Sequence, residues 1–127
     1  MYSASIENRG DTKYHASAGN YGFVMDTEGQ GIGPGDALMA SLCACLGHYV
    51  RDFMRKEKAA YTSFNIRAEA GSSKDGRRLG DISVVIAMSG AELDERQERE
   101  LLAYVEACKI HATLKANGTI AKQLKHA

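Results

Sequence analysis

The sequence lacks long apolar runs and carries no excess of either charge. No apolar stretch approaches the ~18 residues that a membrane-spanning helix requires. Sixteen basic residues balance sixteen acidic ones. Binding to nucleic acid or to an anionic membrane needs a concentrated positive field, which a balanced total disfavours, although it leaves room for a local patch. We therefore expect neither a nucleic acid nor a membrane among the partners.

Cysteine is also scarce: the chain has three, Cys43, Cys45 and Cys108. A secreted domain held together by disulfides carries more of them. The first residues, MYSASIENRGDTKYH, show no basic start followed by an apolar run, so we expect no secretory signal. The expected compartment is the cytoplasm, where such thiols are buried apolar filler or reactive groups.

The length of 127 residues predicts one domain over residues 1–127. Alternation of apolar and polar residues over the first 26 positions, interrupted by turn-forming types, predicts a β-meander. Residues 64–70 and 82–88 alternate in the same way. Between them lies Asp75-Gly76, a pair that hairpin turns favour.

The only proline, Pro34, follows a glycine-rich segment and stands where a helix can begin, because a first-turn proline needs no amide hydrogen. Apolar residues recur at helical spacing from Asp36 to about Lys58. Between Ala37 and Leu46 nearly every residue is small or apolar. A helix that is apolar on all faces must be buried on all faces, so we expect a second subunit to cover it, in a homodimer.

A second helix is predicted from Asp94 to Cys108, because Asp94 and Gln97 have the spacing of a capping box. Its expected buried stripe is Leu101, Leu102, Val105 and Cys108. A further helical turn is expected to end at Asn117-Gly118, with a short strand at 119–124 after it. The elements together predict an α+β domain.

Spacing alone leaves the role of the cysteines open. Cys43 and Cys45 lie about 200° apart around one helix and cannot pair inside it. Cys45 and Cys108 each share an apolar stripe of their helices. If these helices pack together, the two thiols can reach disulfide distance. The alternative is that both are apolar filler.

Two segments resemble signatures of the OsmC/Ohr family. In GPGDALMASLCACLGHYVRDF a proline opens the helix and Cys45 follows eleven positions after Pro34, which is the spacing of that family's peroxidatic cysteine. In ELLAYVEACKIHATLKANGTI, Cys108 matches its second cysteine, and Thr113 and Leu114 follow as they do there. The order of the elements matches over nearly the whole chain.

The resemblance implies an OsmC-like fold: an N-terminal β-meander, a long buried central helix, a β-hairpin, a second helix and a short C-terminal strand, in an intertwined homodimer. It also implies a peroxidase for organic hydroperoxides that needs no cofactor or metal, with Cys45 peroxidatic and Cys108 resolving. A small thiol or dithiol would be the reductant. Cys43 has no family role and is interpreted as filler.

The family also implies an arginine from the N-terminal strands that stabilises the thiolate. Arg9 is the candidate, and its alternative is an exposed turn residue. Active members commonly place a glutamate directly after the proline, to orient that arginine. Here Gly35 stands in that position, and Asp36 is the candidate one residue later. The alternative for Asp36 is a first-turn acid favoured by the helix dipole.

Two other functions remain open from the sequence. Cys45 with His48, and Cys108 with His111, have one-turn spacing and the residue types of a four-ligand zinc site. The glutamate missing at Gly35 instead favours a non-catalytic relative that binds an apolar ligand at the dimer interface.

Overall fold

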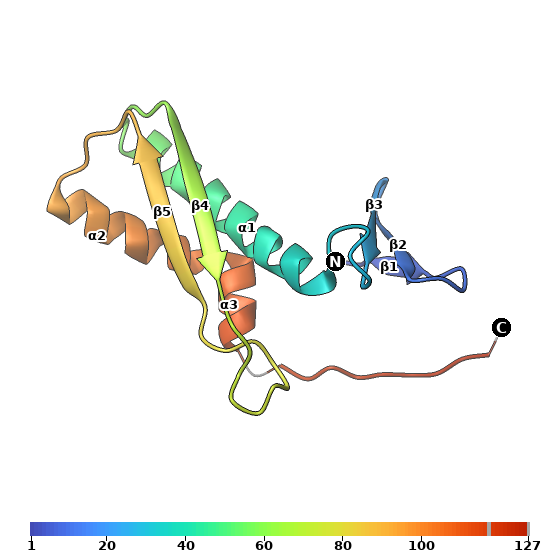
Figure 1. Cartoon of the computed structure of the whole chain (residues 1–127). Coiled ribbons are helices and arrows are strands. Elements are labelled where there is room, and N and C mark those ends of the chain that lie inside the picture. Colours follow the sequence, from blue (N-terminus) through green and yellow to red (C-terminus); the bar gives the residue numbers. More distant parts are fainter. Residues whose placement is uncertain (117, 127) are drawn as a thin grey trace. The chain divides into compact units, whose positions relative to one another are not determined.

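The structure is a computed structural model that describes residues 1–116 and 118–126. It divides into two compact units, residues 1–41 and 42–127, with the boundary inside the central helix. The expectation of one domain stays a prediction. The elements, labelled in Figure 1, are β1 (Ser5–Glu7), β2 (Lys13–Ala18), β3 (Tyr21–Asp26), α1 (Pro34–Lys56), β4 (Ser63–Glu69), β5 (Ser83–Ser89), α2 (Glu95–Tyr104), the 3-10 helix η1 (Val105–Ala107) and α3 (Lys109–Lys115).

The N-terminal unit contains the predicted meander. Its three strands are antiparallel in the order β1-β2-β3. Gly19 has a φ of 61° in the tight turn between β2 and β3, a conformation that glycine adopts without steric cost. The buried Asp26, the last residue of β3, stabilises the turn that follows. Its Oδ1 accepts a hydrogen bond from the Glu28 amide at 2.8 Å. Helix α1 then begins at Pro34, as predicted.

The C-terminal unit is built on the second part of α1. Figure 1 shows β4 and β5 running along this helix. Gly47 permits the close approach, because a Cβ there would lie 3.3 Å from Cε2 of Phe64. The buried core comes from α1, α2, η1 and the residue before α3: Leu42, Leu46, Val50, Phe53, Met54, Leu101, Val105 and Cys108.

The hairpin is confirmed with its predicted alternation. Strands β4 and β5 pair antiparallel, with Phe64 opposite Met88 and Ile66 opposite Ile86. These four side chains are half-buried and pack against the core. Gly76 has a φ of 72° in the connecting loop, where the Asp-Gly pair was expected.

Three expectations about the C-terminal half are wrong in detail. Helix α2 ends at Tyr104, and Cys108 lies beyond it as the N-cap of α3. Leu102 is 58% exposed, because it lies about 100° around the helix from the buried Leu101. The described residues 118–126 form no strand.

The C-terminal strand does not form because the segment has no neighbouring strand in the described part of the chain with which to pair. A strand is held by ladder hydrogen bonds to a neighbour, and the structure gives the segment at 119–124 no such neighbour among the described residues. Ile120 and Leu124 are each 81% exposed. The expected end of the preceding turn at Asn117 lies outside the described residues.

Candidate active site

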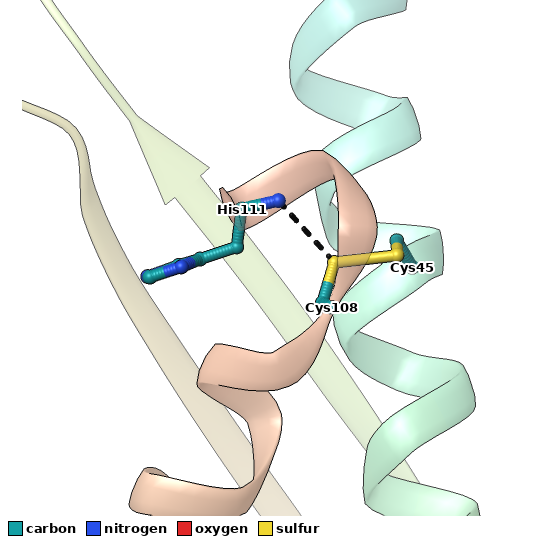
Figure 2. The surroundings of a disulfide bond; sticks show 3 residues. All are labelled: Cys45, Cys108 and His111. Carbon is teal, nitrogen blue, oxygen red and sulfur yellow. Dashed lines mark hydrogen bonds between the residues drawn. A yellow bond between two sulfur atoms is a disulfide. The ribbon is translucent and has the colours of Figure 1, made fainter. Parts of the chain in front are cut away.

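Cys45 and Cys108 form a disulfide within the C-terminal unit, and their Cα atoms lie 6.0 Å apart. Figure 2 shows the two sulfurs bridging from α1 to the segment that leads into α3. The two residues are 63 positions apart in the chain. The expectation that two inward thiols from different helical segments reach disulfide distance is thereby confirmed.

Local structure explains how each sulfur reaches the other. Cys45 lies between the buried residues Leu42 and Leu46 on α1 and is itself half-buried. Cys108 is fully buried and has an extended ψ of 131°, which separates η1 from α3. Its position at this break, rather than inside a continuous helix, directs its sulfur toward α1.

The sulfur of Cys108 accepts a hydrogen bond from the backbone amide of His111 at 3.4 Å. Figure 2 shows the His111 imidazole turned away from both sulfurs, so the contact is made by the backbone alone. Through this contact the sulfur of Cys108 caps the N-terminus of α3. Sequence reasoning missed this contact, because it placed Cys108 at the end of the second helix and considered His111 only as a possible metal ligand.

A cavity of about 360 Å³ lies in the C-terminal unit. Its wall includes Leu42, one turn before Cys45, and His111, whose amide contacts Cys108. The rest of the wall combines apolar side chains with two charged ones: Ile82, Val84, Leu114, Asp81 and Lys115, together with Gly80. The cavity therefore offers apolar surface to an organic molecule, although neither cysteine of the disulfide lines it. Sequence reasoning did not single out this cavity, because its wall joins residues distant in the chain.

Arg9 and Asp36, the two other candidate residues, belong to the N-terminal unit. Nε of Arg9 donates to Oε1 of Glu7 at 2.5 Å, and both side chains are largely exposed. This hydrogen bond, and then the charge of Arg9, lowers the pKa of Glu7. Sequence reasoning missed Glu7, which ends β1 two residues before Arg9. Asp36 lies exposed in the first turn of α1.

The geometry does not support the alternative zinc site. Both of its cysteines are bonded to each other. Among the described residues, no group of three or more histidine, cysteine, aspartate or glutamate side chains is arranged to hold a metal ion. His48 is exposed and stacks edge-on against Tyr49.

Comparison with known proteins decides the family. The family model described as OsmC-like protein matches residues 27–122. The chain belongs to the OsmC-like family. The resemblance of the two cysteine segments is thus confirmed. No curated protein matches the chain.

Solved structures agree with this membership. The OsmC-like protein from Mycoplasma pneumoniae is 19% identical with a TM-score of 0.80, over 91% of this chain and 87% of that one. The organic hydroperoxide resistance protein OhrB of Bacillus subtilis is 16% identical with a TM-score of 0.60, over 92% of each chain. An organic hydroperoxide resistance protein OsmC from Legionella pneumophila is 15% identical with a TM-score of 0.67, over 92% and 90%. At these identities the likeness establishes the OsmC-like α+β fold.

No helix in the described part of the chain is long and apolar enough to span a membrane.

Proposed function

We propose that this OsmC-like protein is a thiol-dependent peroxidase that reduces organic hydroperoxides through Cys45 and Cys108. The observation that carries the proposal is the disulfide between these two residues, 63 positions apart. Two of the proteins with similar structures are described as organic hydroperoxide resistance proteins. The role would be defence against oxidative stress, with the cytoplasm as the expected compartment.

The cycle has three steps. The Cys45 thiolate attacks the terminal peroxide oxygen, an S–O bond forms, and the O–O bond breaks to release the alcohol after protonation. Cys108 then attacks the sulfenic acid on Cys45, which forms the disulfide and releases water. A small thiol or dithiol returns two electrons and two protons by exchange, and is itself oxidised to a disulfide.

The cavity whose wall includes His111, the residue whose amide bonds Cys108, supports an organic peroxide as substrate. Leu42, Ile82, Val84 and Leu114 offer an apolar wall. Each methylene of a substrate buried there contributes about 0.8 kcal/mol, a gain that hydrogen peroxide does not have.

We assign the stabilising cation to Arg9 and a supporting carboxylate to Asp36. Asp36 replaces the family's glutamate, whose position is taken by Gly35. Glu7 already orients Arg9 within the N-terminal unit and can assist in this role. Because the Arg9–Glu7 pair is exposed, its own contribution to stability is small, and its value would lie in positioning.

The functional unit is proposed to be a homodimer. Apolar side chains of the N-terminal unit and of the first turns of α1 are exposed in the single chain, among them Tyr21 (84%), Phe23 (55%) and Leu38 (39%). Large apolar side chains left exposed in the single chain favour association with a partner. A second copy of the same chain is the expected partner.

The direct test is peroxide consumption by the purified protein with a dithiol reductant. Cys45→Ser should abolish turnover. Cys108→Ser should still undergo the first oxidation but recycle inefficiently, because the protein then holds no resolving thiol for the sulfenic acid. Cys43→Ser is the matched control and should retain turnover. Full activity in Cys45→Ser would exclude the proposed mechanism.

A second candidate is a non-catalytic protein that binds an apolar ligand at the dimer interface. Gly35 in place of the glutamate favours it. In that case peroxide would not turn over, and the reduced Cys45 would react slowly with alkylating reagents. The same preparations therefore separate the two functions.

A further inference from the structure

We propose that Tyr104 is a positioning residue for the resolving step, because its hydrogen bond to Asp52 keeps Cys108 facing Cys45 after the disulfide is reduced. The inference rests on the proposed two-cysteine cycle, in which Cys108 must reach the sulfenic acid on Cys45. We call the contact of Tyr104 with Asp52 and Lys56 the tyrosine anchor. Reduction breaks the disulfide and leaves the tyrosine anchor in place.

The disulfide and the tyrosine anchor lie along one side of α1. Asp52 follows Cys45 by seven residues, which is about two helical turns. The two side chains therefore leave the helix within about 20° of each other, and about 10 Å apart along its axis. Tyr49 lies between them, and its ring centroid is 5.9 Å from that of Tyr104. One line of α1 thus carries Cys45 and the residues that Tyr104 contacts.

A short helical segment connects Tyr104 to Cys108. Tyr104 is the last residue of α2, and η1 fills the three positions before Cys108. The Cys108 amide closes this turn by donating to the carbonyl oxygen of Val105 at 3.1 Å. Four steps at the ~2 Å rise of a 3-10 helix span about 8 Å, close to the separation of Asp52 and Cys45 along α1. Holding Tyr104 at Asp52 therefore determines where Cys108 lies along α1.

Charged groups on α1 hold the Tyr104 hydroxyl. It donates to the Asp52 carboxylate, and Nζ of Lys56 donates to the hydroxyl oxygen at 2.7 Å. The same Nζ lies 4.9 Å from the centroid of the Tyr104 ring. Hydrogen bonds to ionised groups are stronger than those between neutral groups, and the Asp52 side chain is only 19% exposed. Neither cysteine takes part, so the tyrosine anchor does not depend on the disulfide.

The tyrosine anchor acts on one step of the cycle. In that step the Cys108 sulfur attacks the sulfenic sulfur of Cys45, the S–S bond forms, the S–O bond breaks and water leaves. Restricting one reactive group near another raises its effective concentration and so accelerates their reaction. The earlier attack of Cys45 on the peroxide does not involve Cys108. The tyrosine anchor therefore speeds resolution without changing the first oxidation.

Equilibration with glutathione measures the tyrosine anchor without any peroxide. Two molecules of reduced glutathione convert the disulfide into two thiols and become one oxidised glutathione, so the equilibrium constant gives the effective concentration of Cys108 toward Cys45. Cys43→Ser, used as the background for every variant, removes the third thiol.

Tyr104→Phe keeps the ring and removes the hydroxyl. It should lower the effective concentration roughly tenfold, the loss expected when a hydrogen bond to a charged group is removed. Tyr61→Phe, at a half-buried tyrosine that packs against Phe64, is the matched control and should leave it unchanged. Equal values for Tyr104→Phe and the parent protein would overturn the proposal.

A double-mutant cycle assigns the effect to the contact itself. Asp52→Ala removes the acceptor from the α1 side and should match Tyr104→Phe. The double variant should lose no more than either single variant, because both remove the same contact. Additive losses would mean that the two residues act separately, and the positioning role of their hydrogen bond would be wrong.

Single-turnover kinetics test the role in the cycle. After mixing with cumene hydroperoxide, samples quenched with dimedone at set times report the sulfenic acid on Cys45. In Tyr104→Phe this species should form at the parent rate and persist roughly ten times longer. Slowing of both steps to the same degree would indicate a general disturbance of the fold and would overturn the proposal. If the parent protein forms no sulfenic acid but the glutathione equilibrium shifts in Tyr104→Phe, the tyrosine anchor stands and the peroxidase function fails.

Discussion

The hydroxyl of Tyr104, on α2, donates a hydrogen bond to the carboxylate of Asp52, on α1. Nζ of Lys56 lies 2.7 Å from the same hydroxyl oxygen and 3.4 Å from Oδ2 of Asp52. The Tyr104 ring also packs on Phe53, with centroids 5.8 Å apart. These contacts of Tyr104 connect the end of α2 to α1. Cys108 follows four residues later in the chain.

The Asp52 carboxylate is expected to make stability depend on acid pH. The Tyr104 hydrogen bond, with smaller contributions from Lys56 and Arg55, lowers the pKa of Asp52 from its ordinary value of 3.8. A lowered pKa in the folded state stabilises the fold above the unfolded value, and this contribution is lost as pH falls through the lowered one. Asp52→Asn should therefore flatten the loss of stability below about pH 4.

Urea unfolding midpoints measured across that pH range would test this prediction. Glu106→Gln, which changes an exposed carboxylate on η1, is the control and should keep the wild-type pH dependence. Parallel curves for Asp52→Asn and wild type would show that the contact does not contribute.

Reduction of the disulfide should destabilise the protein. A crosslink between residues 63 positions apart restricts the unfolded chain, and the loop-entropy relation gives up to about 4 kcal/mol for such a separation. Guanidinium unfolding with and without a reductant measures the difference. Cys45→Ser, which cannot form the bond, should unfold identically in both conditions, and Cys43→Ser should respond as the wild type does.

Two adjacent leucines on α2 should differ sharply in their importance. Leu101 is 4% exposed and Leu102 is 58% exposed. Leu101→Ala should lower the free energy of unfolding by roughly 2 to 5 kcal/mol, because it leaves a cavity in the core. Leu102→Ala should cost much less. Chemical denaturation of the two variants compares them directly, and equal losses would show that α2 presents a different face to the core.

The pairing of Arg9 with Glu7 predicts a kinetic effect if Arg9 acts in catalysis. Arg9→Ala should slow the oxidation of Cys45 by an organic hydroperoxide, and Glu7→Gln should slow it less. Single-turnover measurements separate this step from reduction by the dithiol. Arg67→Ala removes an arginine paired in the same way with Glu69 on β4 and should have no effect. An unchanged rate in Arg9→Ala would reassign Arg9 as an exposed turn residue.

Features set by short-range rules could be predicted from the sequence. Strand alternation placed the meander and the hairpin, and Pro34 marked the start of α1. The Asp94–Gln97 capping box is present as expected, because it depends on residues three apart. The resemblance of the two cysteine segments to family signatures indicated the family and implied the pairing of Cys45 with Cys108.

Tertiary structure decided the rest, because it determines which surfaces meet. The extended backbone at Cys108 and the exposure of Leu102 depend on how α2 and α3 pack against α1. The hydrogen bond from Tyr104 to Asp52 joins two residues that are far apart in the chain and lie on different helices. Local patterns specify each element and the face it buries, whereas contacts between elements follow from their packing in three dimensions.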